Sequence, residues 1–413
     1  MKIAIITSSF YPVIDGVTIA VFNRIEHLSK LGHEVVLFCP DYSAIEYIYP
    51  DWQQYTGKIL PGVEVISLPS TESIGLDFER DVTQNSYKFI VKKLAVFQPD
   101  IIHIDEAERL GICLLKKPGI EFARQYNIPC VAFFHTNYLE YLDDYFSLPL
   151  GLNGFVKGVL NLIFTNIYNA YDLTLVSSRV TFDKLAARGI KNLHHAELLG
   201  FNIAKFQPVT KTPDFFTRNY NIENIKSKIK LIFVGRLTPD KGWNFAIDAL
   251  SKLPREILSQ IAFIIVGDGN LKDRITQELT ELIPNVYLLG RVPPNAISSL
   301  LINSDIFVTN SEKETRGLAV IEARAAGIPI IAPDAGGISD TVRDCHNGLL
   351  YEPHNKEDFI AKLVLLISDS NLRHQLGINN KARKSLLSWQ QATDNLIDIW
   401  QAEINKKTSN HDR

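Results

Sequence analysis

Two glutamates on either side of a glycine, Glu314, Gly317 and Glu322, mark the part of this chain with the clearest chemistry. The segment from Ser311 to Ala332 has the pattern of a loop, a helix and a buried strand. A glycine before a helix lets a ligand approach the backbone, and the helix directs its unpaired N–H groups and the positive end of its dipole at that ligand. Such a position favours an anion, most simply a diphosphate. The flanking carboxylates can accept hydrogen bonds from sugar hydroxyls, so the pattern suits a nucleotide sugar.

A second loop supplies two cations. Arg236 and Lys241 lie between Gly235 and Gly242, directly after the apolar strand predicted from Ile229 to Val234. When a sugar leaves a nucleotide, negative charge grows on the diphosphate, and preplaced cations and helix N–H groups lower the barrier. Taken alone, an arginine and a lysine in such a loop are more often solvated surface residues.

The run Glu314-x7-Glu322 followed by Ala-x-Ala-Ala-Gly-Ile-Pro resembles the signature of the retaining GT-B glycosyltransferases of family 4, and the match extends over nearly the whole chain. The resemblance implies that Glu314 contacts the hydroxyls of the donor sugar, that Glu322 contacts the ribose, and that Arg236 and Lys241 stabilise the departing diphosphate. Arg316 stands where the family most often has phenylalanine. Retention of the anomeric configuration by front-face displacement is also implied. Neither a metal ion nor a cofactor is expected beyond the nucleotide-sugar donor, and the sequence has no DxD metal motif.

Two positions in the first half of the chain extend this prediction. His135 follows an apolar strand, Cys130 to Phe134. An isolated histidine there is usually structural or solvated, whereas the resemblance makes it an active-site residue that hydrogen-bonds the donor sugar. Gly16 opens the first predicted helix within the turn Ser9 to Val17. A plain turn and a backbone approach to the donor phosphate or the acceptor are equally good interpretations of that turn.

Three further turns follow predicted strands in the second half. Arg291 and Val292 resemble the family segment whose backbone flanks the nucleotide base, which does not separate uracil from guanine. Gly267 to Gly269 is interpreted as a structural turn, and Asp334 to Gly337 as either a site-lining turn or a plain loop. The predicted donor-binding residues are Gly16, Arg236, Lys241, Arg291, Val292, Glu314, Gly317, Leu318, Ala319 and Glu322. The predicted catalytic residues are His135, Glu314, Arg236 and Lys241.

The positioning elements are expected to form two domains, because 413 residues exceed the size at which a single core keeps growing. Short apolar runs alternate with amphipathic segments, as doubly wound parallel sheets require. Predicted strands are 2–7, 34–39, 64–68, 101–104, 129–135, 173–177, 229–234, 261–266, 286–289, 306–309 and 329–332. Predicted helices include 18–31, 81–97, 112–125, 182–188, 243–250 and a mostly helical region over 150–171.

The predicted fold is α/β of GT-B type, with two Rossmann-like domains facing each other across a cleft. Residues 1–205 form the acceptor domain and residues 206–387 the donor domain, which begins with a linker over 206–228. In the resembled family a terminal helix, here 388–405, packs back on the first domain.

Composition excludes several classes of protein. A net charge of −3 provides no overall field for nucleic acid, and no nucleic-acid-binding module is visible. The four cysteines lack CxxC spacing and histidine partners at metal-ligand spacing, which favours a reducing cytoplasm over a zinc or disulfide protein. The N-terminus leads directly into a strand without a signal-peptide core.

The acceptor is predicted to be a hydroxyl compound, and a membrane glycolipid is one hypothesis for it. The apolar run Leu148 to Ala170 is interrupted by Asn153, Lys157, Asn161 and Asn166, so it can lie on a membrane without crossing it. Together with His135 to Tyr138, the region resembles glycolipid-forming members of the family, and peripheral contact at the inner face of a membrane is expected. Lysines of the first domain would add basic charge, although such stripes are usually solvated: Lys92, Lys93, Lys116 and Lys117.

Two other functions remain open at this stage. A GT-B nucleotide-sugar epimerase would need no acceptor, and a catalytically silent protein would bind a sugar nucleotide without turnover. A dinucleotide dehydrogenase is disfavoured, because Gly-x-Gly-x-x-Gly does not follow the first strand.

Overall fold

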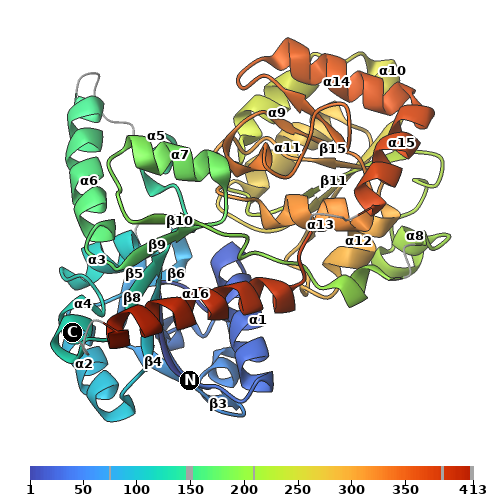
Figure 1. Ribbon diagram of the computed structural model, residues 1–413. Coiled ribbons are helices and arrows are strands. Elements are labelled where there is room, and N and C mark those ends of the chain that lie inside the picture. The colour runs from blue at the N-terminus through green and yellow to red at the C-terminus, as the bar shows by residue number, and fades with distance from the viewer. Residues whose placement is uncertain (74–75, 146–151, 208–209, 383–385, 410–413) are drawn as a thin grey trace. The chain divides into compact units, whose positions relative to one another are not determined.

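The computed structural model describes residues 1–73, 76–145, 152–207, 210–382 and 386–409, and its chain forms two compact units (Figure 1). The first unit comprises Met1–Leu139, Ser147–Gly200 and Leu387–Arg413, and the second comprises Glu140–Phe146 and Phe201–Leu386. Each unit is built on a mainly parallel sheet, so the predicted α/β class is confirmed.

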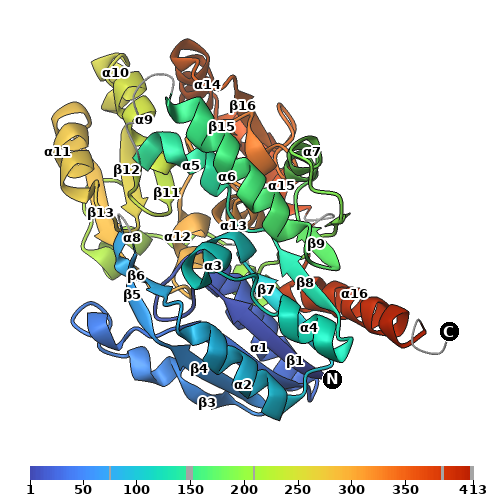
Figure 2. The same ribbon diagram turned by 90° about the vertical axis from the view of Figure 1, so that its left-hand side faces the viewer.

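Within the described residues the first unit has an eight-stranded sheet in the order β10-β9-β8-β7-β1-β2-β4-β3 (Figure 2). Neighbouring strands are parallel except β3 and β4, which are antiparallel. The strands are β1 (Lys2–Thr7), β2 (Glu34–Pro40), β3 (Gly57–Leu60), β4 (Val63–Leu68), β7 (Ile101–Asp105), β8 (Cys130–Phe133), β9 (Leu173–Val176) and β10 (Leu193–His195). A separate hairpin is formed by β5 (Ser70–Ser73) and β6 (Leu76–Val82).

The helices of the first unit cover its sheet with apolar faces. Val17, Val21, Ile25 and Leu28 recur at helical spacing along α1 and are buried. Helix α16 packs along α1, and His27 Nε2 lies 2.8 Å from Asp394 Oδ1 of that helix. The helices are α1 (Gly16–Lys30), α2 (Ser86–Phe97), α3 (Ala107–Leu114), α4 (Ile120–Tyr126), α6 (Leu152–Tyr168), α7 (Arg179–Ala187) and α16 (Trp389–Ser409). Helix α5 (Tyr138–Tyr145) begins in the first unit and continues into the segment assigned to the second.

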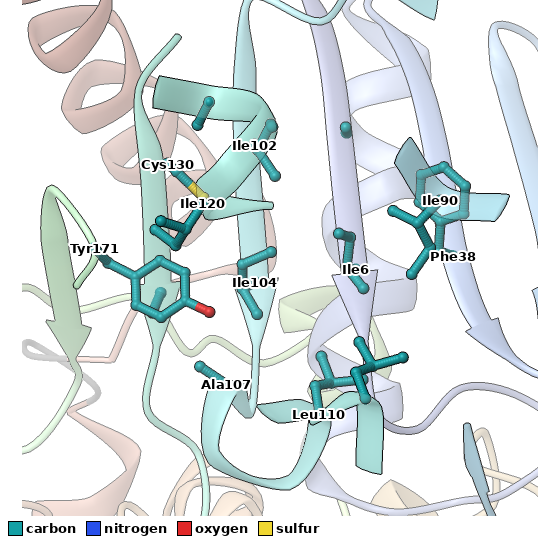
Figure 3. Packing of buried hydrophobic residues seen from close by; sticks show 14 of the residues in the cluster. Ile6, Phe38, Ile90, Ile102, Ile104, Ala107, Leu110, Ile120, Cys130 and Tyr171 are labelled. Carbon is teal, nitrogen blue, oxygen red and sulfur yellow. The ribbon is translucent and has the colours of Figure 1, made fainter. Parts of the chain in front are cut away.

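The core of the first unit lies on both faces of the sheet. Ile6, Ile102 and Ile104 belong to the cluster drawn in Figure 3, whereas Ile3 and Ile5 belong to the cluster on the opposite face. This alternation follows from the period of two in a strand, and burial on both faces explains why the strands are almost wholly apolar. Each such isoleucine contributes roughly 1.5–3 kcal/mol through burial.

Within the described residues the second unit has a six-stranded, wholly parallel sheet in the order β13-β12-β11-β14-β15-β16. Its strands are β11 (Ile229–Val234), β12 (Ile261–Val266), β13 (Val286–Gly290), β14 (Ile306–Val308), β15 (Ile330–Pro333) and β16 (Gly348–Tyr351). Its helices are α8 (Phe215–Tyr220), α9 (Trp243–Leu250), α10 (Arg255–Leu258), α11 (Lys272–Leu282), α12 (Ile297–Asn303), α13 (Leu318–Ala326), α14 (Lys356–Ser368) and α15 (Ser370–Lys381).

The predicted strands are all present, but two predicted helices are wrong. The predicted helix 112–125 is divided into α3 and α4, because Leu115 and Gly119 adopt φ values of 51° and 76°. The predicted helix 81–97 starts too early, since Asp81 lies in β6 and its carboxylate accepts from Arg109 Nε at 2.8 Å. In the region predicted as mostly helical, α6 is confirmed from Leu152 on, and residues 150 and 151 lie outside the described residues.

The linker prediction over 206–228 is only partly right, because α8 forms within it; residues 208 and 209 lie outside the described residues. In the part of the chain that the structure describes, no helix is long and apolar enough to cross a bilayer.

In both sheets the chain adds strands first on one side of the unit's first strand and then on the other side. The position where the side changes is called the reversal point. From β1 the chain proceeds outward through β2 and β4, and then returns to add β7, β8, β9 and β10 on the other side. From β11 it proceeds through β12 and β13, and then returns to add β14, β15 and β16. Loops diverge at such a reversal, so the carboxyl ends of β1 with β7, and of β11 with β14, are the positions where ligands bind in open α/β sheets.

Candidate functional site

The N-terminus of α13 follows β14 at the reversal point of the second sheet. Gly317 precedes the helix with φ 75°, a conformation that a residue with a Cβ rarely adopts. Among the described residues none caps this end with its side chain, and Val320 N–H is bonded back to the Gly317 carbonyl at 3.0 Å. The amides of Leu318 and Ala319 therefore belong to the first turn, whose N–H groups a helix leaves for an outside partner.

A lysine and a glutamate from neighbouring loops form an ion pair beside this helix. Lys241 Nζ lies 2.6 Å from Glu314 Oε1 and 3.3 Å from Asp240 Oδ2. Arg236 Nη2 lies 3.8 Å from the same Asp240 oxygen, and Asp240 is buried. Burial alone would lower the pKa of the Lys241 ammonium, but the carboxylates of Glu314 and Asp240 raise it above its ordinary value. Lys241 is therefore positively charged at physiological pH.

Close backbone contacts hold these two loops together. The Ser311 hydroxyl donates to the Asp240 carbonyl at 3.3 Å. A Cβ added at Gly242 would lie 2.2 Å from the Asn310 carbonyl oxygen, so no other residue fits there. The turn from Asp334 to Gly337, predicted as either a site-lining turn or a plain loop, contacts the loop that carries Glu314. Its Gly337 N–H donates to the Glu314 carbonyl at 2.8 Å.

Glu322 lies within α13, after the first turn. Burial raises the pKa of its carboxyl to about 7, and the positive charge of Lys205 partly opposes this shift. Glu322 is thus able to accept or donate a hydrogen bond near neutral pH.

The structure accounts for the arginine at the position where phenylalanine was expected. Arg316 is only 7% exposed, and its Nη1 lies 3.6 Å from Asp340 Oδ2. Its charge is therefore compensated within the second unit.

The predicted base-flanking turn lies at the end of β13. Arg291 Nε is 3.4 Å from Asp268 Oδ2 and partly exposed, and Val292 is half-buried beside it. The turn from Gly267 to Gly269 packs tightly on the Arg236 loop, since a Cβ at Gly267 would lie 1.8 Å from the Gly235 carbonyl oxygen. This packing agrees with the structural interpretation of that turn.

In the first unit His135 follows β8 and contacts a buried carboxylate. Its Nε2 lies 2.6 Å from Asp105 Oδ1, at the end of the adjacent strand β7. Arg24 Nη1 lies 2.9 Å from Asp105 Oδ2. Although burial would raise the pKa of the Asp105 carboxyl, Arg24 and His103 hold it well below its usual range. Asp105 is therefore ionised.

A second carboxylate ends β7 in an unusual backbone conformation. Glu106 has φ 58° and is almost fully buried. Its carboxylate accepts hydrogen bonds from the hydroxyls of Ser8, Thr136 and Tyr138, the last at 3.0 Å. A non-glycine residue with positive φ persists only where its surroundings determine it, as often happens at functional sites.

The turn around Gly16 differs from the turn around Gly317. The Asp15 carboxylate accepts from Thr18 N–H at 2.7 Å and caps α1, and the Ser9 hydroxyl donates to its other oxygen at 3.2 Å. Gly16 is exposed at the first position of this helix. Because a carboxylate already occupies the helix end, this position suits a hydroxyl better than a phosphate.

The structure thus brings together Lys241, Glu314 and, through Asp240, Arg236, while Glu322 lies on the helix that Gly317 begins. Sequence reasoning missed Asp240 and the polar groups around His135. These missed groups are Ser8, Arg24, His103, Asp105 and Glu106. Polar residues within and just after an otherwise apolar buried strand, as in Ile101–Asp105, were the available signal.

Tyr141 lies on the part of α5 that is assigned to the second unit, and it is a further residue near Lys241 and its two carboxylate partners. Burial raises the pKa of its hydroxyl, and the charges of Lys241, Asp240 and Glu314 act on it. Among the described residues, histidine, cysteine and carboxylate side chains form no group that could hold a metal ion.

Comparison with known proteins identifies the family of this chain. Residues 14–195 match the family model for Glycosyltransferase Family 4, and residues 216–383 match that for Glycosyl transferases group 1. The chain is 30% identical to a GDP-mannose-dependent alpha-mannosyltransferase of Mycolicibacterium smegmatis, over 99% of both proteins. It is 23% identical to an alpha-monoglucosyldiacylglycerol synthase of Streptococcus pneumoniae, over 90% of this chain and 80% of that protein.

A solved structure shares the fold. The Anabaena protein HepE in complex with UDP and glucose superposes with a TM-score of 0.72 at 18% identity, over 97% of this chain and 99% of that protein. Its GT-B fold agrees with the two parallel-sheet units described above. The chain therefore belongs to the family 4 glycosyltransferases of GT-B fold and is a hexosyltransferase.

Proposed function

We propose that this enzyme moves a hexose from a GDP- or UDP-linked donor to a hydroxyl acceptor with retention of configuration and without a metal ion. The observation that carries this proposal is the uncapped N-terminus of α13 next to the ion pair of Lys241 and Glu314. Cations and oriented amides there can compensate the charge that a departing diphosphate acquires. A divalent cation is not needed for that charge if Lys241 and Arg236 supply it.

In the proposed reaction the bond between the anomeric carbon and the β-phosphate oxygen breaks, and the acceptor oxygen bonds to the same face of that carbon. The acceptor's proton passes to the oxygen of the departing diphosphate. Lys241 and the amides of Leu318 and Ala319 stabilise this diphosphate, while Glu314 accepts hydrogen bonds from sugar hydroxyls and Glu322 from the ribose. Lys241 is already charged before the donor binds, because Glu314 and Asp240 hold its proton.

GDP-mannose is the first donor to test and UDP-glucose the second. The 30% identical relative is GDP-mannose-dependent, whereas the structural neighbour holds UDP and glucose. Arg291 and Val292 would flank the base through their backbone, so their side chains do not favour one base.

For the acceptor, we propose a lipid-linked hydroxyl at the cytoplasmic face of a membrane. Helix α6 exposes an apolar stripe of Phe155, Val159, Leu162 and Ile163, of which Phe155 is 72% and Leu162 71% exposed. These residues recur at helical spacing, so they share one face. A helix with such a face can lie in the membrane interface. The diacylglycerol named for one relative fits this acceptor class.

The predicted lysine stripe contributes less than the apolar face. Lys116 Nζ is paired with Glu121 Oε1 at 2.8 Å, and Lys93 Nζ lies 5.7 Å from the centroid of the Phe89 ring. An exposed pair of this kind is worth little in water and leaves less net charge for a lipid headgroup.

The test is transfer of labelled hexose from GDP-mannose and UDP-glucose to a diacylglycerol-type glycolipid in mixed micelles. Glu314→Gln and Lys241→Ala should each lower transfer and donor hydrolysis by about 100-fold or more in folded protein. Lys252→Ala is the matched control, because Lys252 lies in an exposed pair with Glu357 at 3.7 Å. Isomerisation of a nucleotide sugar without acceptor would favour an epimerase instead, and near-normal transfer by both site variants would refute the assignment.

A further inference from the structure

A chain of hydrogen bonds runs from the C-terminal helix to His135 through the interior of the first unit. Trp400 Nε1 on α16 donates to His103 Nδ1 at 3.3 Å, and His103 Nε2 lies 3.3 Å from Asp105 Oδ1. The same Asp105 oxygen lies 2.6 Å from His135 Nε2. Trp400, His103 and Asp105 are 0% exposed, whereas the His135 side chain is 5% exposed.

Trp400 and Asp105 determine where the protons of this hydrogen-bond network lie, because an indole N–H can only donate and a carboxylate can only accept. An indole nitrogen is only a donor, so His103 Nδ1 must accept and its proton resides on Nε2. Burial lowers the pKa of His103 to about 4, which keeps its ring neutral. The Asp105 carboxylate is only an acceptor, so both His103 Nε2 and His135 Nε2 carry the protons that it receives.

Such a polar chain is costly in an apolar interior. The indole ring of Trp400 packs in the cluster with Ile3, Ile5 and Leu396, where an apolar side chain would need no hydrogen-bond partner. The network is nevertheless complete, and its most exposed member is His135. Arg24 neutralises the Asp105 charge from the side of α1, so the carboxylate stays ionised without drawing a proton from either histidine.

We propose that Trp400 and His103 are positioning residues that act through Asp105 to fix the ring orientation of His135. This inference rests on the proposed function, in which His135 acts at the reaction centre. The indole holds the His103 ring with its Nε2 proton directed at Asp105, and Asp105 keeps the proton of His135 on Nε2. Loss of the indole N–H leaves His103 held by one of these hydrogen bonds instead of two, so its ring can turn and the Asp105 oxygen that it shares with His135 is no longer held in place.

The experiment compares variants of the full chain in the transfer assay. Trp400→Phe removes the donor but keeps an aromatic ring, His103→Leu removes both ring nitrogens, and His103→Gln keeps a donor directed at Asp105. Leu396→Ala is the control, because it removes buried volume from the same face of α16 without removing a hydrogen bond. Thermal unfolding selects a temperature at which every variant is folded.

We expect kcat to fall about fivefold in Trp400→Phe, the equivalent of one neutral hydrogen bond, and further in His103→Leu. The donor KM should stay within about twofold of wild type, because a positioning defect acts on the reacting geometry and not on donor binding. His103→Gln should recover most of kcat, and Leu396→Ala should match the wild type.

A second readout does not depend on turnover. In 15N-histidine spectra the His135 signal, identified by its loss in His135→Asn, should show a proton on Nε2 in both the wild type and Trp400→Phe, but its Nε2–H resonance should shift in Trp400→Phe because the hydrogen bond to Asp105 changes. An unchanged His135 Nε2–H resonance in Trp400→Phe, or a kcat equal to that of Leu396→Ala, would overturn the proposal. If His135→Asn itself retains turnover, the active-site role of His135 fails separately, and the spectra still decide whether Trp400 controls its hydrogen bond to Asp105.

Discussion

The two helix N-termini at the reversal points of the two sheets differ in whether a side chain caps them. Helix α1 is capped by the Asp15 carboxylate, which accepts from Thr18 N–H at 2.7 Å. Helix α13 begins at Gly317 and, in the described part of the chain, no side chain caps it. One helix end at a reversal point is therefore satisfied by a side chain of the protein, and the other leaves the N–H groups of its first turn without a side-chain cap among the described residues.

The charged side chains near the two helix N-termini also differ. In the first unit Arg24 pairs with buried Asp105, and the carboxylate of Glu106 is satisfied by hydroxyls. In the second unit Lys241 is shared between Asp240 and Glu314, beside the uncapped helix. Two cations, Lys241 and Arg236, thus lie near the uncapped helix of the second unit, whereas a carboxylate, Asp15, occupies the helix end of the first. On this ground the proposed function assigns the donor diphosphate to the second unit.

The largest effect is expected at the lysine of the second site. Lys241→Ala should lower kcat/KM for transfer by about 100- to 1000-fold, the range for loss of one group that stabilises developing negative charge. Lys241→Arg should retain part of the activity, because the charge remains. Steady-state kinetics with saturating acceptor measure this effect. A loss of less than about threefold would mean that the uncapped helix and not the lysine carries the difference between the two sites.

The apolar stripe of α6 should matter only for membrane contact. Replacing Phe155 and Leu162 together by serine removes two exposed apolar side chains, each worth roughly 1.5–3 kcal/mol when fully buried. Partitioning to vesicles in a sedimentation assay should fall at least about tenfold, while turnover on a water-soluble acceptor stays at the wild-type rate. Unchanged partitioning would show that this face does not meet the membrane.

A buried acid in the first unit provides a pH test. Burial raises the pKa of the Glu108 carboxyl from 4.5 to about 8, and the nearby charge of Glu106 adds to this shift. Because the folded pKa lies above the unfolded value, the folded state retains a proton that the unfolded chain has lost between pH 4.5 and 8. The free energy of unfolding therefore falls as pH rises through that window.

Glu108→Gln should abolish this loss while keeping an acceptor for the Tyr168 hydroxyl. The stability difference between the variant and the wild type should grow by at most about 1.4 kcal/mol per pH unit across the window, as measured by urea unfolding. A constant difference would show that Glu108 does not titrate there.

The smallest effect is expected at the capped helix. Asp15→Ala removes the cap of α1 and should lower the free energy of unfolding by about 1 kcal/mol. Donor KM should be unchanged, because the donor is assigned to the other helix end. A fall in kcat/KM comparable to that in Lys241→Ala would erase the distinction between the two sites.

Much of the fold was predictable because the strands are buried on both faces and stand out as apolar runs. Ile229–Val234 and Ile261–Val266 were located to the residue. The short strand β16 and the hairpin of β5 and β6 were missed, since Ser70–Ser73 is polar and Gly348–Tyr351 is too short to show a period. The break between α3 and α4 depends on left-handed Leu115, which no propensity indicates.

The site was predictable where the residues within a loop indicate its chemistry by themselves, and less so where the partners come from separate strands and helices. Glu314 and Lys241 were both selected, and the structure shows the bond between them. His103 and Asp105 lie on β7, His135 follows β8 and Trp400 lies on α16, so their network is visible only after the sheet aligns β7 with β8 and α16 packs on the same unit. Contacts of this long range cannot be derived from spacing along one chain.

The most direct test follows backbone amide resonances during titration with GDP. The account predicts large chemical-shift changes for the amides of Leu318 and Ala319 at the start of α13. In Lys241→Ala these changes should not reach saturation at the GDP concentration that saturates the wild type. The amides of Val17 and Thr18 at the start of α1 should not move, because Asp15 already occupies that end. Shifts at Val17 and Thr18 with none at Leu318 and Ala319 would contradict it.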